Sequence, residues 1–266
     1  KMLIKQKFNK NQYEIIVAYN GFKNYNLDLL NTFTQDYPFL IKYVIEDRIL
    51  SSYAARNKGI KVAKGHVLAF TDSDCIPALN WLSQGYYTLI QNKSAMVAGR
   101  IKFSFRNSKP NIWEYFDASK KLNQKSYVDN AGFGATANLF VRKSMFDKYG
   151  LFLKDLKSGG DYEFGRRLTK SGEQIIYDQY ALVNHPARFT FKEKYIKSKR
   201  IARGQEHLST IGLANQNKFT WKKLLPTKNL SLLPEIKIGI HTKILLIFIN
   251  NIFRYLNYYW RYTYKP

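Results

Sequence analysis

The stretch SSYAARNKGIKVAKGHVLAFTDSDCIPALNWL, residues 51–82, decides the fold class of this 266-residue chain. Residues 52–64 have the composition of a helix, which stops at Gly65. The short apolar run 67–71 follows and is typical of a buried strand, and it leads directly into Asp72-Ser73-Asp74. A helix that leads into a buried strand indicates an α/β sheet.

The same alternation continues on both sides of this stretch. Further strands are predicted at 14–18, 41–45, 95–105, 132–141, 174–177 and 180–184. Further helices are predicted at 26–36, 111–122, 144–149 and 161–170. Pro77 is expected to open a helix whose Leu79 and Leu82 face inward. We therefore predict a mostly parallel, Rossmann-like sheet flanked by helices.

The composition permits a packed core and excludes several classes of protein. Hydrophobic residues make up 45% of the chain and aromatic residues 16%, which rules out a wholly disordered chain. Cys75 is the only cysteine, so a disulfide framework and a cysteine-rich zinc site are excluded. The first residues lack the apolar region of a signal peptide. The longest apolar run, 244–249, is far shorter than the roughly 18–20 residues that span a bilayer.

The chain is strongly basic, and the charge is concentrated near its end. It has 43 Lys and Arg against 19 Asp and Glu, a formal charge of +24. Residues 191–266 carry 15 basic and three acidic residues, half of the excess. A positive field favours anionic partners such as phosphate-bearing substrates, acidic lipids or nucleic acid. An abundance of Lys, Asn, Ile and Tyr is also typical of AT-rich genomes, so both explanations of the overall charge stay open.

The C-terminal segment predicts an amphipathic helix. Lys243, Asn250, Arg254, Asn257 and Arg261 fall on one polar stripe of a helix, with a wide apolar face opposite. Such a helix can pack on the rest of the protein. It can also lie in an anionic membrane surface, with aromatic side chains at headgroup depth, and the two possibilities are compatible. These aromatic residues are Tyr255, Tyr258, Tyr259 and Trp260.

Four short motifs are candidates for chemistry. Asp72 and Asp74 follow a strand at the sheet edge where α/β proteins bind ligands. They suit a divalent cation that holds a diphosphate, or they are two solvated aspartates of a turn. Asp161 begins a helix, so it is either an N-cap or first-turn carboxylate favoured by the helix dipole, or a general base. Gly159-Gly160 before it would admit an acceptor. The loop of Gly132 and Gly134 has room for a sugar or phosphate, or is an ordinary turn. His185 ends a strand and gains significance only near a metal.

In combination, these motifs resemble family 2 glycosyltransferases of the GT-A fold. The resemblance rests on Ala-Arg-Asn-x-Gly in the helix, the strand into Asp-x-Asp, and the Pro and Trp that follow. GGDYEFGRRL, at 159–168, is similar to the acidic base motif of that family, and IIYDQYALVNHP, at 175–186, to its closing strands and histidine. The similarity covers roughly residues 3–210. The family members are inverting enzymes that use a nucleotide-sugar donor.

The resemblance implies a role for each candidate residue. Asp74 would ligate Mn²⁺ or Mg²⁺ at the nucleotide diphosphate, and Asp72 would hold the metal or the ribose. Asp161 would be the catalytic base, and His185 a further ligand of the metal or phosphate. The remaining residues would contact the donor: Arg56 and Asn57 its nucleotide, Gly132 and Gly134 its sugar.

The chain departs from the family pattern in two places. Family members begin with a strand of the type V-S-V-I-I-P-x-Y-N, whereas residues 1–12 match the helix that should follow it. We therefore expect the first strand to be missing, which would leave 14–18 interior with one neighbour absent. The next family strand ends in an aspartate that reads the base, and Tyr19 stands at that position here. Tyr19 could stack on the base instead.

These observations predict a metal-dependent glycosyltransferase in cell-surface polysaccharide or glycolipid synthesis. Residues 1–190 would form the catalytic domain, and residues 191–266 a basic helical region on an anionic membrane surface. The expected location is the cytoplasm, peripherally on the cytoplasmic face of the inner membrane. A sugar nucleotidyltransferase is the alternative enzyme, and a nucleic-acid binder is disfavoured because no motif supports it. The donor sugar, base, acceptor, linkage and oligomeric state are not predicted, because they depend on pocket shape.

Overall fold

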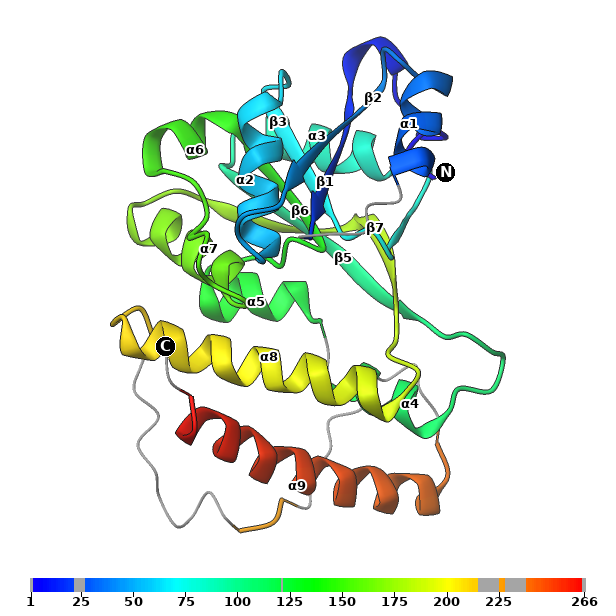
Figure 1. The fold of residues 1–266 in the computed structure, drawn as a ribbon, viewed down its shortest axis with the longest axis vertical. Coiled ribbons are helices and arrows are strands. Elements are labelled where there is room, and N and C mark those ends of the chain that lie inside the picture. Colours follow the sequence, from blue (N-terminus) through cyan, green and yellow to red (C-terminus); the bar gives the residue numbers. More distant parts are fainter. Residues whose placement is uncertain (1, 22–26, 121, 215–224, 228–237, 265–266) are drawn as a thin grey trace. The chain divides into compact units, whose positions relative to one another are not determined.

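A computed structural model describes the whole chain except residues 1, 22–26, 121, 215–224, 228–237 and 265–266 (Figure 1). The chain forms two compact units. Unit 1 comprises residues 1–102 and 123–184, and unit 2 comprises residues 103–122 and 185–266. Unit 2 thus includes a segment that the predicted boundary at residue 190 assigns to the catalytic domain. That domain division stays a prediction.

The strands form two sheets. β1 (Ile15–Asn20) and β2 (Ile41–Glu46) pair in parallel, and α1 (Leu27–Asp36) connects them. The second sheet has five strands in the order β3-β6-β5-β7-β4. They are β3 (Val67–Thr71), β6 (Asn138–Arg142), β5 (Met96–Ser104), β7 (Ile175–Pro186) and β4 (Ile76–Pro77). The predicted strands at 174–177 and 180–184 are therefore one long strand. β1, β2, β3, β5 and β7 begin within one residue of the predicted positions, whereas β6 begins at Asn138 and not at 132.

The α/β class is confirmed, but strand direction differs from the prediction in the larger sheet. The pairs β3·β6, β5·β6 and β4·β7 are all antiparallel, and the parallel pair is β1·β2. Side chains alternate in the same way along parallel and antiparallel strands, so the apolar pattern carries no information on direction. Direction is set by the connections, which run through α4 (Ile112–Ser119) and α5 (Gln124–Ala131) between β5 and β6.

The predicted helix 52–64 is α2 (Ser52–Val62), which begins where the Ser51 hydroxyl accepts a hydrogen bond from the Tyr53 amide. The helix predicted to begin at Pro77 is wrong. Residues 76 and 77 form β4 against β7, and α3 (Trp81–Gln91) begins four residues later. Leu79 is 41% exposed and does not face inward. Pairing with a long strand outweighs the local preference of proline for a helix start.

The described residues before β1 form no strand and no α-helix. Residues 2–5 form a turn, and Lys10–Gln12 form a 3-10 helix. The expected match of residues 1–12 to a family helix is therefore wrong for the residues that the structure describes. Within this part of the chain, β1 pairs with β2 alone and β3 pairs with β6 alone. Residues 2–12 thus do not supply the expected missing neighbour of β1.

The core of unit 1 lies between α3 and the five-stranded sheet. Trp81, Leu89 and Phe140 are almost fully buried there, together with Val97, Ala181 and Val183. The Trp81 indole donates a hydrogen bond to the Asn138 side chain over 2.8 Å, which satisfies its only polar atom. This packing holds β6 beside β3, the strand that ends at the predicted carboxylate motif.

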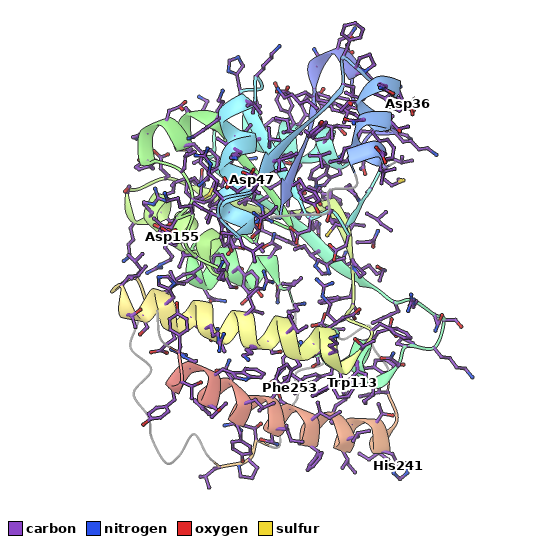
Figure 2. All side chains as sticks on the ribbon, in the orientation of Figure 1. Asp36, Asp47, Trp113, Asp155, His241 and Phe253 are labelled. Carbon is purple, nitrogen blue, oxygen red and sulfur yellow. The ribbon has the colours of Figure 1, made fainter. Side chains whose placement is uncertain are left out.

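Unit 2 is built around three helices. α4, α8 (Phe191–Thr210) and α9 (Ile240–Tyr262) enclose Phe116, Ala202, Leu246, Ile249, Phe253 and Trp260. Figure 2 labels Phe253, which belongs to this cluster, and Trp113 of α4, which packs against it. None of the helices in the described residues combines the length and the hydrophobicity of a transmembrane span. The predicted C-terminal helix is confirmed, and one edge of its apolar face packs inside unit 2.

Part of the polar stripe of α9 makes contacts within unit 2. Asn250 is buried and accepts a hydrogen bond from Lys120, while Arg261 forms an ion pair with Glu206 over 2.8 Å. Trp260 is 1% exposed, so its predicted place at lipid headgroups is wrong. A second apolar edge remains on the outside, and we call it the exposed α9 stripe. It consists of Ile244, Leu245, Phe248, Ile252, Tyr255, Tyr259 and Tyr262, which are between 39% and 92% exposed.

Candidate active site

Asp72 and Asp74 lie in the turn directly after β3, as the sequence predicts. The Cys75 amide closes this turn with a hydrogen bond to the Asp72 carbonyl. The chain then enters β4, where Ile76 pairs with Asn184 of β7. His185 is the next residue of β7, so this strand fixes its position although the division between the units falls just before it. One ligand atom each of Asp72, Asp74, Cys75 and His185 lies within 4.8 Å of the others.

This group of side chains fits a divalent cation. Two carboxylates supply the hard oxygen ligands that Mn²⁺ and Mg²⁺ prefer. The Nδ1 atom of His185 lies 2.9 Å from the Pro186 carbonyl oxygen, which can only accept a hydrogen bond. Nδ1 therefore carries the proton, and the lone pair is on Nε2, as in a metal-binding histidine. Burial, followed by the charges of Asp72 and Asp74, raises the pKa of Cys75 to about 12, so its thiol is neutral at physiological pH.

Arg56 connects α2 to the carboxylate motif. Its guanidinium forms an ion pair of 2.7 Å with the Asp72 carboxylate, and the side chains are 17% and 35% exposed. The guanidinium also lies 5.6 Å from the centre of the Tyr53 ring, one helical turn earlier. The arginine of the Ala-Arg-Asn sequence thus fixes one carboxylate of the predicted metal site.

Asp161 is linked to the same helix through Tyr53. The Tyr53 hydroxyl donates a hydrogen bond of 3.2 Å to the Asp161 carboxylate. Burial, followed by the charge of Asp161, raises the pKa of Tyr53 above its ordinary value, so the hydroxyl keeps its proton. The Thr136 amide lies 3.4 Å from the other carboxylate oxygen of Asp161. Tyr53 and Arg56 therefore form a path of contacts from Asp161 to Asp72.

Asp161 is not the cap of its helix. α7 (Gly160–Lys170) has Gly159 at the N-cap position, with a left-handed backbone at φ 87° that favours glycine. A Cβ on Gly160 would approach the Tyr53 ring to 2.9 Å. The two glycines therefore permit the turn and the contact with Tyr53, which is a structural reason for them apart from the expected approach of an acceptor. Asp161 is therefore not the N-cap. It lies in the first turn of α7, as the second structural alternative has it, and its carboxylate accepts a hydrogen bond of 3.0 Å from the Tyr162 amide.

Asn57 is engaged inside the protein. Its side-chain amide donates to the Phe152 carbonyl over 2.8 Å, and its oxygen accepts from the Phe152 amide over 3.1 Å. The residue is buried. These two hydrogen bonds connect α2 to the segment before α7. The expected contact of Asn57 with a nucleotide stays a prediction.

Gly132 and Gly134 face the protein's own atoms. Gly132 ends α5 with φ 63°, and a Cβ there would lie 2.7 Å from the Thr169 hydroxyl. A Cβ on Gly134 would lie 2.8 Å from Ala98 and Leu139. Close packing explains both glycines, whereas their expected contact with a donor sugar stays a prediction. Tyr19, near the end of β1, pairs with Ile45 of β2, and its expected stacking on a base stays a prediction.

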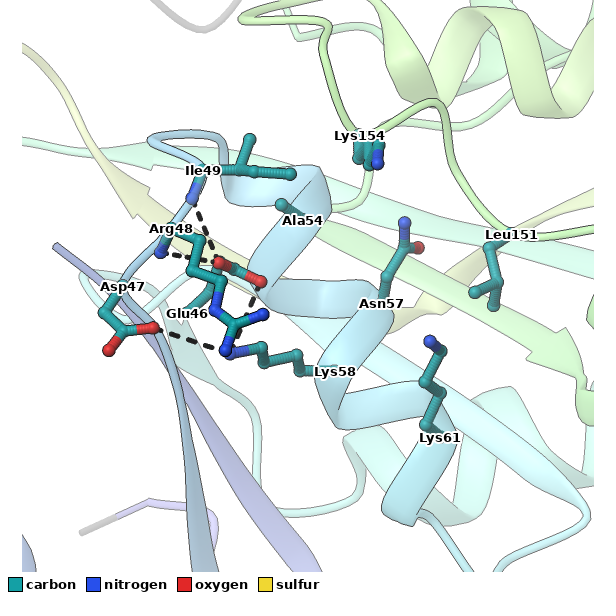
Figure 3. Close-up of a pocket in the computed structure, with 10 residues that line it drawn as sticks. All are labelled: Glu46, Asp47, Arg48, Ile49, Ala54, Asn57, Lys58, Lys61, Leu151 and Lys154. Atoms are coloured by element: carbon teal, nitrogen blue, oxygen red, sulfur yellow. Dashed lines mark hydrogen bonds and ion pairs between the residues drawn. The ribbon is translucent and has the colours of Figure 1, made fainter.

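A hollow of about 500 Å³ lies beside α2 (Figure 3). Asn57 is the predicted site residue that lines it, and Asp72, Asp74 and Asp161 do not. Many of the residues that line it are charged and come from the end of β2, the loop after it, α2 and the segment before α7: Glu46, Asp47, Arg48, Lys58, Lys61 and Lys154. Lys58 forms ion pairs with Glu46 and Asp47 over 3.5 and 3.8 Å. This hollow is therefore separate from the carboxylate motif.

The structure thus brings together most of the predicted site. Asp72, Asp74 and His185 form one group, and Asp161 joins it through Tyr53 and Arg56. The sequence analysis did not identify Tyr53. The signal was available, because Tyr53 and Arg56 are three residues apart and so lie on one face of the predicted helix.

The chain belongs to the family described as Glycosyl transferase family 2, whose pattern matches residues 1–150. Proteins similar to this chain are named as glycosyltransferases. Glycosyltransferase AglE of Haloferax volcanii is 33% identical over 200 residues, which cover 75% of this chain and 65% of that protein. Pre-mycofactocin glycosyltransferase of Mycobacterium tuberculosis is 28% identical over 145 residues, 53% of this chain and 31% of that protein. The chain thus spans less than two thirds of the length of these relatives.

Solved glycosyltransferase structures share the fold. A mannosyltransferase from Pyrobaculum calidifontis, solved with GDP-Man and Mn²⁺, superposes with a TM-score of 0.60 at 10% identity over 97% of this chain and 66% of that one. Residues 1–349 of TarS from S. aureus, solved with UDP-GlcNAc, give 0.56 at 15% identity over 95% of this chain and 67% of that one. The predicted GT-A fold is confirmed by these similarities.

Proposed function

We propose that the chain carries the catalytic site of a metal-dependent, inverting glycosyltransferase. The donor is a nucleotide-diphosphate sugar and the acceptor is a hydroxyl group. The observation that carries this proposal is the group of Asp72, Asp74 and His185 at the end of β3, with Asp161 linked to it through Tyr53 and Arg56. Family membership and the names of the similar proteins support the same reaction.

In the proposed reaction, the acceptor oxygen attacks the anomeric carbon from the face opposite the diphosphate. The new bond joins these two atoms, the bond from the anomeric carbon to the diphosphate oxygen breaks, and the nucleotide diphosphate leaves with the electron pair. The acceptor proton passes to the Asp161 carboxylate. The Tyr53 hydroxyl, held protonated by its raised pKa, orients that carboxylate through their hydrogen bond. Asp161 is thus the proposed base and Tyr53 its positioning residue.

The carboxylate group at β3 would hold the diphosphate end of the donor. Asp74 and His185 would bind a Mn²⁺ or Mg²⁺ ion, with Asp72 as a ligand or as a contact of the ribose. A bound divalent cation offsets the negative charge that develops on a leaving diphosphate. Arg56 keeps Asp72 in place through their ion pair and adds positive charge on the same side.

A sugar nucleotidyltransferase remains the alternative. It would also bind a nucleotide and a divalent cation, but it attacks phosphorus with a sugar phosphate and has no need of a base for an acceptor hydroxyl. The hydrogen-bonded position of Asp161 favours the glycosyltransferase. Release of a nucleotide diphosphate, rather than of pyrophosphate, distinguishes the two reactions.

The acceptor is proposed to be a cell-surface polysaccharide or glycolipid. The similar proteins include a poly(ribitol-phosphate) β-glucosyltransferase of Bacillus spizizenii, 33% identical over 102 residues that cover 38% of this chain and 16% of that protein. Peripheral location on the cytoplasmic face of the inner membrane belongs to the same proposal. Its support is the exposed α9 stripe together with the basic charge of residues 191–266.

Two substitutions test the assignment of roles. Asp161→Asn keeps the size of the side chain but removes the proton acceptor, so turnover should fall by about 10²–10⁴-fold. Binding of the nucleotide with Mn²⁺ should remain nearly normal. Asp74→Asn removes a charged ligand, so nucleotide binding in the presence of Mn²⁺ should weaken as well. Sugar transfer and calorimetric nucleotide binding are measured for both, with the full-length protein.

Asp155→Asn is the matched control, because Asp155 is an exposed carboxylate of the same unit. It should leave transfer and binding unchanged. Near-normal transfer by Asp161→Asn would disprove the base assignment, and Glu163, two residues further along α7, would be the next carboxylate to substitute. Undiminished Mn²⁺-dependent binding by Asp74→Asn would disprove the metal assignment.

A further inference from the structure

A buried carboxylate binds two lysines inside unit 2. Asp117 of α4 is 1% exposed and accepts hydrogen bonds from Lys194 over 2.6 Å and from Lys197 over 3.1 Å. The Arg188 amide donates to the same carboxylate over 3.1 Å. Although burial raises the pKa of this carboxyl group, the charges of Lys197 and Lys194 outweigh it and hold the pKa well below its ordinary value. Asp117 is therefore ionised.

A third lysine lies beside this pair and contacts no carboxylate in the described residues. Lys120 donates a hydrogen bond to the Asn250 side chain. Its Nζ lies 5.0 Å from the centre of the Phe116 ring, and the Nζ of Lys194 lies 5.1 Å from the same centre. Burial, followed by the charges of Lys194 and Arg254, lowers the pKa of Lys120 to about 8. Burial also lowers the pKa of Lys197.

In the described part of unit 2, Lys194 and Lys197 thus share the Asp117 carboxylate, and Lys120 contacts the same Phe116 ring as Lys194. We call Lys120, Lys194 and Lys197 the lysine cluster. Charges removed from water are costly unless an opposite charge compensates them, and one Asp117 carboxylate compensates one of the three. A bound anion would supply the remaining negative charge. Lys120 is exposed to solvent, so an anion can approach the cluster where Lys120 lies.

We propose that the lysine cluster is an anion site of unit 2 that binds a phosphoryl group. A phosphate monoester carries about −1.5 to −2 charges near neutral pH, which matches the surplus. Its several oxygens accept charge-assisted hydrogen bonds from lysines. The group can come from free phosphate or from a phospholipid headgroup. The site lies in a different unit from Asp161 and Asp74, so it is independent of the catalytic assignment.

The first experiment measures binding of inorganic phosphate to the full chain by calorimetry, with chloride at equal ionic strength as the reference. Phosphate should bind the wild type in preference to chloride, and Lys120→Gln should weaken this binding at least tenfold. Lys192→Gln, which removes one charge from an exposed position of α8, should bind phosphate like the wild type. No preference for phosphate, or an equal loss in the two variants, would overturn the proposal.

A second measurement does not depend on a variant. Amine-reactive labelling of the wild type at pH 8, read by mass spectrometry, should slow severalfold at Lys120 on addition of phosphate and stay constant at Lys192. Unchanged labelling of Lys120 would overturn the proposal. Phosphatidylcholine vesicles with and without phosphatidic acid identify the source of the group. If Lys120→Gln weakens binding to the phosphatidic acid vesicles, the site binds a headgroup. If it weakens binding of inorganic phosphate alone, the site binds the free ion.

Discussion

Tyr53 shows how one side chain can connect a carboxylate to the rest of a site. Its hydroxyl reaches Asp161, its ring packs on Gly160, and Arg56 lies over the ring. Arg56 is three residues from Tyr53 in the sequence, whereas Asp161 and Gly160 are more than 100 residues away. The candidate base and the carboxylate motif are therefore held relative to each other by α2.

We expect Tyr53→Phe to lower turnover about tenfold with little change in the KM for the donor. The ring and its packing remain, but the hydrogen bond to Asp161 is lost, and hydrogen bonds to charged groups contribute about 1.5–3 kcal/mol. Steady-state kinetics check this split between turnover and KM. Tyr149→Phe is the control, because it removes a comparable tyrosine hydrogen bond of 2.7 Å to Glu173 away from Asp161. A similar loss of turnover in both variants would contradict the positioning role.

Two glycines within helices of unit 1 differ in what surrounds them. A Cβ on Gly85 of α3 would lie 2.2 Å from the Phe140 ring, whereas a Cβ on Gly59 of α2 would lie 3.7 Å from Ala18 and Ile16. Alanine favours a helix over glycine by about 1 kcal/mol. Gly59→Ala should therefore raise the free energy of unfolding by about 0.5–1 kcal/mol. Gly85→Ala should lower it by about 1–3 kcal/mol, since Phe140 is tightly packed.

Denaturant titration of the two variants checks the sign of both changes. Opposite signs would confirm that α3 lies directly on β6, while α2 lies at ordinary contact distance from β1. A stabilised Gly85→Ala variant would mean that the contact of α3 with Phe140 is looser than the structure has it.

The helices of unit 2 depend on the ionised Asp117. Asp117→Asn should lower the free energy of unfolding by about 3–5 kcal/mol near neutral pH, because it leaves Lys194 and Lys197 without an opposite charge. The pKa of Asp117 is lowered by folding, so its contribution is fully present above its unfolded pKa of about 3.9 and is lost as pH falls below that value. Denaturant titrations at pH 7 and at pH 3 should show a smaller difference between wild type and variant at pH 3.

At the scale of the whole molecule, the basic charge of unit 2 and the exposed α9 stripe are both properties that favour binding to an anionic membrane surface. Unit 2 contains 20 Lys and Arg against five Asp and Glu. A triple substitution of Ile244, Phe248 and Tyr259 by Ser, all in the exposed α9 stripe, should reduce cosedimentation with anionic vesicles severalfold. Wild-type binding should also fall as salt is raised, because the attraction of the basic residues is screened. If the triple variant cosedimented with anionic vesicles as strongly as the wild type, membrane contact through α9 would be contradicted.

The sequence by itself predicted the α/β class, the family and the carboxylates after β3. These follow from local signals: an apolar run, a helix stop at Gly65, and two aspartates directly after a strand. It also predicted the amphipathic character of α9, because helical periodicity is a property of the chain alone.

Only the tertiary structure decided the direction of the strands, the start of α3 and the surroundings of α9. Pleated strands look alike in either direction, so antiparallel pairing of β6 depended on its connections. Pro77 joined a strand because β7 extends beside it. Trp260 and Asn250 were buried because α4 and α8 cover one side of α9, whereas Phe248 and Tyr259 stayed exposed. Which neighbours a residue meets depends on distant segments, and local sequence patterns do not encode those contacts.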